Sequence, residues 1–139
     1  MENYLSKIIV DTCFHIHVGL GPGLLESVYE EVLFYELTQQ GFGVKRQFPI
    51  PIVWQNIEME QGFRADLILE DSVLIEIKSV SKIEPVHKKQ TLTYLRLTGL
   101  KLGLLVNFNE ALIKDGKAPR IFSLCDSATL RELKFFGEF

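Results

Sequence analysis

Two alternating segments joined by a short polar turn constrain the fold of this chain more than any other feature. Residues 63–69 and 73–80 each alternate with the period of two that is typical of β-strands, and residues 70–72 between them are polar. The two segments are therefore predicted to form an antiparallel hairpin. A three-residue loop sets a register in which Asp66 lies directly opposite Glu76, with about 5 Å between their Cβ atoms.

Alternation also predicts which face of the hairpin is buried. The apolar positions are expected to point together into one core, namely Phe63, Ala65, Leu67, Leu69, Val73, Ile75 and Ile77. Asp66 and Glu76 then share the opposite face, where like charges are destabilising unless something neutralises them. A divalent metal ion would do so, because carboxylate oxygens suit Mg²⁺ or Mn²⁺ and not zinc. The alternative is a salt-bridge ladder in which Arg64 and Lys78 compensate the pair.

The segment after the hairpin indicates a mixed sheet. A helix is predicted over 84–98, because Pro85 favours a first helical turn and Gly99 a helix end. The short apolar run 102–108 then reads as a buried strand. A helical crossover of this kind places 102–108 parallel to 73–80.

The remaining segments complete one mixed α/β domain over residues 1–139. A helix is expected at 6–18, capped by Ser6, with Ile9, Cys13 and Ile16 inward. A second helix is expected at 24–40 and ends at Gly41, with Leu25, Val28, Val32 or Leu33, and Leu37 inward. The other expected elements are an edge segment at 44–54 containing Pro49 and Pro51, a strand from Ile57, a turn at 114–117, a strand at 121–124 and a helical tail at 127–136.

The composition fits a globular protein of one domain. The chain has 139 residues, of which 47% are hydrophobic and 24% charged, so disorder and coiled coil are not expected. We expect no membrane span and no signal peptide, because the sequence has no apolar run of sufficient length and no basic start. Cys13 and Cys125 do not make a disulfide framework. A cytoplasmic protein with free thiols is the resulting expectation.

Charge is distributed unevenly along the chain. The net charge is −3, yet residues 78–101 hold six basic side chains against Glu84 alone. Such a segment can bind a polyanion locally, or it can be the solvated face of a helix. The candidate nucleic-acid contacts are Lys82, His87, Lys88, Lys89 and Arg96.

Two further patterns bear on the chemistry. His87, Gln90 and Tyr94 recur at helical spacing and form one polar stripe, which either faces the carboxylates or is ordinary helix surface. Glu26 stands in the first turn of a helix that follows a glycine-rich loop, where it either takes part in the site or complements the helix dipole.

Several of these segments, in this order, resemble one known family. They are Gly23-x-x-Glu26-x-x-Tyr29, Gly62-Phe63-Arg64-Ala65-Asp66-Leu67, Ile75-Glu76-Ile77-Lys78, His87-x-x-Gln90-x-x-x-Tyr94-Leu95 and Leu104-Leu105-Val106-Asn107-Phe108. Together they are similar to the blocks of the GxxExxY proteins, small prokaryotic proteins of the PD-(D/E)XK nuclease superfamily, over roughly residues 5–121. The run Lys117-Ala118-Pro119-Arg120 departs from the tighter Gly-x-Lys-Arg pattern of that family.

The resemblance implies a restriction-endonuclease-like core, a mixed β-sheet flanked by helices, and hydrolysis of phosphodiester bonds with Mg²⁺ or Mn²⁺. It implies that Asp66 and Glu76 bind the metal ion and that Glu26 binds or orients it. Lys78 would then orient or activate water, while Gln90 and Tyr94 would position the phosphate or the lysine.

The implied partner is nucleic acid, DNA rather than RNA, with a homodimer left open and no membrane. The alternative function is a catalytically silent module of the same fold that binds protein partners, or binds nucleic acid without cleaving it.

Overall fold

The computed structural model describes residues 2–111, 119–125 and 131–133. Its elements, in chain order, are α1 (Glu2–Leu20), α2 (Glu26–Gln39), β1 (Val44–Ile50), β2 (Val53–Trp54), β3 (Ile57–Glu58), β4 (Phe63–Leu69), β5 (Val73–Lys78), α3 (Pro85–Thr98), β6 (Leu102–Ala111), β7 (Pro119–Cys125) and β8 (Arg131–Leu133). None of the helices described is long and apolar enough to cross a membrane.

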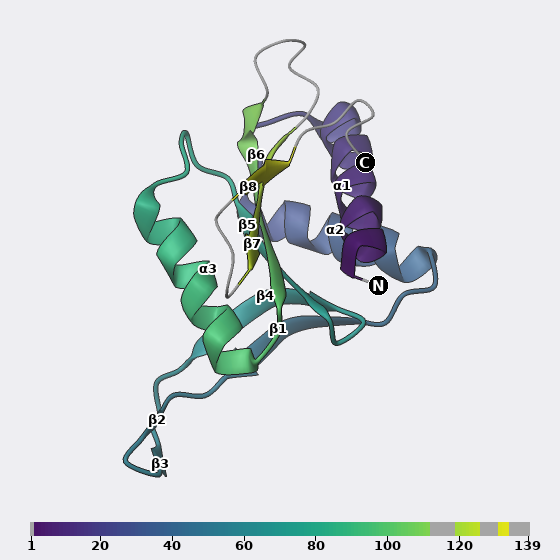
Figure 1. The fold of residues 1–139 in the computed structure, drawn as a ribbon. Coiled ribbons are helices and arrows are strands. Elements are labelled where there is room, and N and C mark those ends of the chain that lie inside the picture. Colours follow the sequence, from purple (N-terminus) through teal and green to yellow (C-terminus); the bar gives the residue numbers. More distant parts are fainter. Residues whose placement is uncertain (1, 112–118, 126–130, 134–139) are drawn as a thin grey trace.

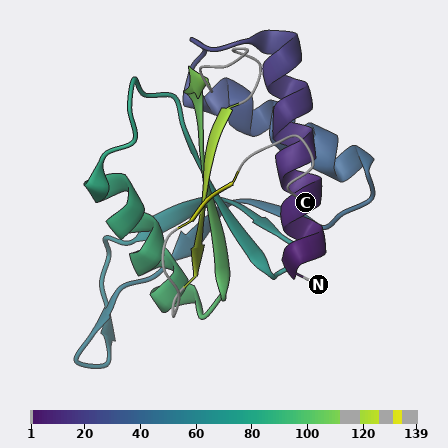
Figure 2. The ribbon, with the colours of Figure 1, turned by 45° about the horizontal axis from the view of Figure 1, so that its top comes forward.

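Six of the strands form one mixed sheet with helices on both faces. The strand order is β1-β4-β5-β6-β7-β8, and β5 and β6 pair in parallel while the other neighbours are antiparallel. Figures 1 and 2 show α1 and α2 on one side of this sheet and α3 on the other. β2 and β3 form a separate hairpin that projects from the ends of β1 and β4 (Figure 1). This is the expected restriction-endonuclease-like arrangement, with β5 and β6 parallel as predicted.

The sheet is buried on both faces, as expected for a mixed sheet flanked by helices. The α1/α2 core contains Ile9, Cys13, Ile16, Tyr29, Leu33, Leu37 and the inward residues Leu67, Leu69, Val73, Ile75 and Ile77 of β4 and β5. The α3 core contains Ala65, Ile68, Leu74, Tyr94, Leu95 and Leu105. The helical crossover covers the second face, so Leu74 and Ile68 are buried there as well.

The alternation of β4 reverses at Asp66, which corrects the predicted faces. Ala65 packs in the α3 core, and Leu67 packs in the α1/α2 core, although regular alternation would put both on one face. At the same level of β1, Gln47 has a positive φ of 51°, the left-handed region that non-glycine residues rarely adopt. The pleat is therefore broken in both strands at the position of Asp66.

Three predictions at the helices and the tail are wrong. Ser6 does not cap α1, because the helix already begins at Glu2. Leu25 and Val28 are 73% and 40% exposed, since the inward stripe of α2 is Tyr29, Leu33 and Leu37 instead. Residues 131–133, expected in a helix, pair with β7 as a strand, which satisfies their backbone groups in the sheet ladder. The rest of the tail and the turn at 114–117 lie outside the described residues.

The other element predictions are confirmed, with bounds within three residues of those predicted. α3 begins at Pro85 and ends before Gly99, whose φ of 75° is the left-handed helix cap that glycine favours. β1 lies at the edge of the sheet, as Pro49 within it and Pro51 directly after it indicate. β7 covers the strand predicted at 121–124.

Candidate active site

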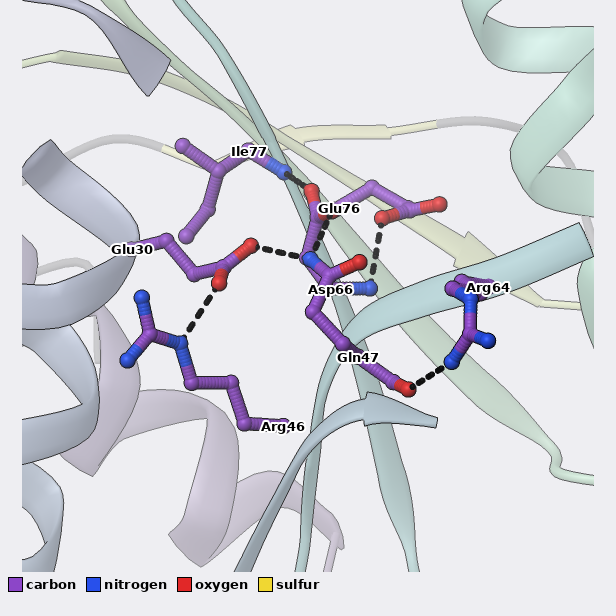
Figure 3. A network of polar contacts seen from close by, with 7 residues as sticks. All are labelled: Glu30, Arg46, Gln47, Arg64, Asp66, Glu76 and Ile77. Atoms are coloured by element: carbon purple, nitrogen blue, oxygen red, sulfur yellow. Dashed lines mark hydrogen bonds and ion pairs between the residues drawn. The ribbon is translucent and has the colours of Figure 1, made fainter. Parts of the chain in front are cut away.

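Asp66 and Glu76 meet where β4 and β5 stop pairing through their backbones. The ladder pairs Leu67 with Ile75, which is the register predicted from the loop length. One residue further, side chains replace the ladder. The backbone N–H of Asp66 donates to Glu76 Oε2 at 3.1 Å, and the N–H of Ile77 donates to Asp66 Oδ2 at 2.8 Å (Figure 3). Each carboxylate thus binds the backbone of the opposite strand, and the two acids are brought together as expected.

Asp66 and Glu76 have too few cationic partners nearby for both carboxyl groups to be ionised. Glu76 is only 6% exposed, and burial, followed by the charge of Asp66, raises the pKa of Glu76 from 4.5 to about 9. Glu76 therefore keeps its proton at neutral pH in the metal-free protein. In the residues described, neither Arg64 nor Lys78 forms an ion pair with these acids, and Arg64 Nη1 donates instead to the backbone oxygen of Gln47 at 3.2 Å. The described part of the chain therefore does not contain the alternative salt-bridge ladder.

The donor set suits a hard cation with few protein ligands. Within residues 2–111, 119–125 and 131–133, no group of three or more His, Cys, Asp or Glu side chains is placed to hold a metal ion. Asp66 and Glu76 therefore offer two carboxylates. Mg²⁺ usually binds through one or two carboxylates and completes its shell with water and substrate phosphate, whereas structural zinc needs four ligands. The pair fits Mg²⁺ or Mn²⁺ on these grounds.

Tyr29 holds the glycine-rich loop that precedes α2. Its ring stacks on Phe108 with centroids 4.3 Å apart and planes 5° apart. Its hydroxyl donates to the backbone oxygen of Gly21 at 2.5 Å and accepts from the N–H of Leu24 at 3.2 Å. Gly23 within this loop has a φ of 100°, which a side chain would strain. Gly23 and Tyr29, the first and last residues of the Gly23-x-x-Glu26-x-x-Tyr29 motif, thus shape the loop that leads to Glu26 at the start of α2.

Glu26 lies at the first position of α2 and reaches the end of β5. Its Oε2 accepts from the backbone N–H of Ser79 at 3.2 Å, and the Ser79 hydroxyl donates to the oxygen of Leu24 at 2.6 Å. These contacts join the glycine-rich loop to the chain directly after Lys78. Glu26 therefore faces the site across a pocket, and is not in one cluster with Asp66 and Glu76.

This pocket has a volume of about 820 Å³ and is open to solvent. It is lined by Gly23, Leu24, Leu25, Glu26, Ser27, Glu30, Gln47, Asp66, Ser79 and Asn109. Three of these side chains are acids, so the pocket favours cations and disfavours a bare phosphate.

α3 approaches the same acids from the other face of the sheet. Tyr94 is 5% exposed, and burial, then the charges of Glu76 and Asp66, raise the pKa of Tyr94 to about 12. Its hydroxyl stays protonated at neutral pH and can donate. Gln90, one turn earlier, is exposed. Lys78 is half-buried on β5, and its charge lowers the pKa of Glu76, against the larger effect of burial.

The proposed nucleic-acid contacts divide into two groups. His87 Nδ1 accepts from the N–H of Glu84 at 2.9 Å and completes the cap of α3, and Lys88 Nζ lies 4.5 Å from the centre of the Phe122 ring. Lys82, Lys89 and Arg96 are exposed. His87 and Lys88 have structural contacts, and Arg96 Nη2 donates to Thr93 Oγ1 at 3.3 Å on the same helix, whereas Lys82 and Lys89 project toward solvent.

Sequence reasoning missed two residues that border the site. Glu30 is 7% exposed and accepts from Arg46 Nε at 2.7 Å and Gln47 Nε2 at 2.6 Å. Asn107 is fully buried, and its carboxamide exchanges two hydrogen bonds with the backbone of Val80 at 3.0 and 2.9 Å. The available signals were a charged residue beside Tyr29 on the inward stripe of α2 and an amide within an apolar strand.

Comparison with known families gives one match. Residues 3–120 match the family model described as PD-(D/E)XK nuclease superfamily. Comparisons with curated proteins and with solved structures returned no match.

Proposed function

The chain belongs to the PD-(D/E)XK nuclease superfamily, and on that premise we propose that it hydrolyses phosphodiester bonds of nucleic acid with a divalent metal ion. The observation that carries the proposal is the contact between Asp66 and Glu76 at the point where β4 and β5 separate. Within the superfamily we place the chain among the GxxExxY proteins. The hydrogen bonds of Tyr29 and Glu26 give that motif a physical role here, which supports the placement.

Asp66 and Glu76 would hold the metal ion, Mg²⁺ or Mn²⁺. When bound, it would lower the pKa of water and reduce the charge on the phosphate. Glu76 has to release its proton to act as a ligand, because a ligating carboxylate is ionised. Glu26, across the pocket, would orient the cation and its water.

Three side chains would act on the substrate. Lys78, two residues after Glu76 on the same strand, would donate to the attacking water and to a nonbridging phosphate oxygen as a compact positive charge. The protonated hydroxyl of Tyr94 and the amide of Gln90 would donate to the phosphate or hold the lysine. Lys82, Lys89 and Arg96, together with His87 and Lys88, would attract the nucleic-acid backbone, which we propose to be DNA rather than RNA.

A cleavage assay tests the proposal. Supercoiled and linear duplex DNA, single-stranded DNA and RNA are incubated with the protein in Mg²⁺, Mn²⁺ or EDTA. We expect cleavage that requires metal and falls by about a hundredfold or more in Asp66→Asn, since even residues behind the ligands commonly contribute 10- to 100-fold. Asp71→Asn is the matched control, because Asp71 lies in the turn of the same hairpin and pairs with Lys45 at 2.7 Å.

The assay also separates the alternative functions. Metal binding without cleavage of any substrate would favour the catalytically silent module. Nucleic-acid binding that is indifferent to metal and to Asp66→Asn would favour binding alone. Neither binding nor cleavage, in any of these conditions, would contradict the nuclease proposal.

A further inference from the structure

We infer that Gln47 is a positioning residue, which holds the Asp66 carboxylate in the orientation that binds the metal ion. The inference rests on the proposed function, because it assumes that Asp66 is a ligand. It concerns a residue on the edge strand β1, whose neighbour on the sheet is β4. Figure 3 shows the contacts that carry it.

The Gln47 amide bridges two carboxylates. Gln47 Nε2 lies 2.6 Å from Glu30 Oε1 and 3.3 Å from Asp66 Oδ1. Both partners are acceptors, so the nitrogen and not the oxygen of the amide must face them. Its two hydrogens can serve one partner each. The short contact to Glu30 anchors the amide, and the longer contact to Asp66 orients the carboxylate.

Glu30 is held in turn by Arg46. The Arg46 Nε–Glu30 Oε2 distance is 2.7 Å, so each oxygen of Glu30 has one donor. Glu30 is largely buried on α2, and α2 packs against the sheet. A buried carboxylate with both oxygens bound is a rigid support. The chain of contacts thus runs from α2 through Gln47 to β4.

The backbone of Gln47 is strained where the contact is made. Its φ of 51° is costly for a residue with a side chain, and Arg64 Nη1 donates to its carbonyl oxygen at 3.2 Å. With regular strand geometry at Gln47 the pleat would not reverse at this level. The strained conformation therefore accompanies the placement of the amide between Glu30 and Asp66.

Asp66 is fixed from two sides as a result. Its Oδ2 accepts from the N–H of Ile77, and its Oδ1 accepts from Gln47. These two bonds define the plane of the carboxylate and leave lone pairs on both oxygens for a cation. Preorganised ligands of this kind typically gain affinity from the groups behind them.

The competing explanation is that the network only ties α2 to β1. In that case Gln47→Ala would change stability and nothing specific to Asp66. The first experiment needs no metal. Amide hydrogen exchange of Ile77 reports the Asp66 contact, and we expect it to become roughly tenfold faster in Gln47→Ala, the scale of one hydrogen bond. Exchange at Ile75, on the intact ladder, should stay unchanged.

The second experiment measures Mn²⁺ affinity by calorimetry. We expect Gln47→Ala to weaken it by roughly tenfold to a hundredfold. Glu30→Ala should weaken it too, and the double variant should lose no more than Gln47→Ala alone, because Glu30 acts through Gln47. Gln40→Ala is the matched control, since the Gln40 amide bonds to Thr12 at 2.9 Å, on the helices and outside the pocket. If Glu30→Ala does not fold, the Gln47→Ala measurements decide alone.

The outcomes separate the two proposals. Unchanged Ile77 exchange in Gln47→Ala, unchanged Mn²⁺ affinity, or additive losses in the double variant would overturn the positioning role while leaving the nuclease proposal standing. Wild-type protein that binds no Mn²⁺ would overturn the nuclease proposal and the assignment of a metal to Asp66. Faster exchange at Ile77 together with weaker Mn²⁺ binding supports both.

Discussion

At the scale of single residues, the site depends on the protonation of Glu76. Burial and the neighbouring Asp66 favour the neutral form of Glu76, so the pKa of Glu76 is raised to about 9 in the folded protein against about 4.5 unfolded. The folded state therefore binds more protons than the unfolded state between these values. Its free energy of unfolding must fall as the pH rises through this window.

Glu76→Gln tests that linkage. In EDTA, the wild type should lose stability from pH 5 to pH 9 with a slope of up to about 1.4 kcal/mol per pH unit, the value for one proton. Glu76→Gln cannot titrate and should be the more stable protein at pH 8. Urea denaturation at several pH values measures the difference. The exposed Glu58 supplies the control Glu58→Gln, which should follow the wild type. A wild type and a Glu76→Gln protein with parallel pH profiles would refute the raised pKa.

At the scale of elements, the entry loop of α2 depends on one hydroxyl. Tyr29→Phe keeps the ring that stacks on Phe108 but removes the bonds to Gly21 and Leu24. We expect a loss of about 1 kcal/mol in the free energy of unfolding, typical of one or two hydrogen bonds. Cleavage should fall as well, because the loop holds Glu26 and Ser79 in contact. Tyr35→Phe, on the exposed part of the same helix, is the control. Full activity in Tyr29→Phe would show that the loop does not depend on the hydrogen bonds of the Tyr29 hydroxyl.

The basic residues of α3 make a second prediction at this scale. Lys89 is exposed, whereas Lys88 lies over the Phe122 ring. If nucleic acid binds along α3, Lys89→Ala should reduce the slope of log affinity against log salt by about one unit, because one phosphate fewer is neutralised by the protein. Lys88→Ala should reduce stability as well, because it removes a cation–π interaction. Fluorescence anisotropy at several salt concentrations measures the slopes. Equal slopes for all three proteins would remove α3 from the binding surface.

The same elements explain how far the sequence could predict the site. The loop of three residues determines the hairpin register, so the meeting of Asp66 and Glu76 was predictable. The reversal at Gln47 was not, because glutamine gives no signal for a positive φ. Glu30 was missed for a related reason. Its place beside Tyr29 on the inward stripe of α2 indicates burial, but its partners depend on how α2 packs against β1, which is a tertiary contact.

At the scale of the whole molecule, the architecture places the acids between two layers of helices. The mixed sheet separates α1 and α2 from α3 (Figures 1 and 2). The backbone ladder between β4 and β5 ends one residue before Asp66 and Glu76. Glu26 and Glu30 of α2 line the pocket beside Asp66, while Tyr94 of α3 lies on the other side of the sheet. A covered sheet also explains why Glu76 is buried. On a solvated face, burial would not raise the pKa of Glu76, because water would stabilise the charged carboxylate.

The stability of the whole protein therefore offers a test that needs no substrate. Asp66→Asn removes one charge of the pair but keeps an acceptor for the Ile77 N–H, so in EDTA it should unfold with the wild-type free energy or up to about 1 kcal/mol more. Added Mn²⁺ should stabilise the wild type by about 2.7 kcal/mol at a hundredfold excess over its dissociation constant, and should leave Asp66→Asn unchanged. Asp71→Asn should respond to Mn²⁺ as the wild type does. Thermal melts of the three proteins, each with EDTA and with Mn²⁺, measure all of these differences. A wild type indifferent to Mn²⁺, together with a destabilised Asp66→Asn, would mean that the pair serves the fold and not a metal ion.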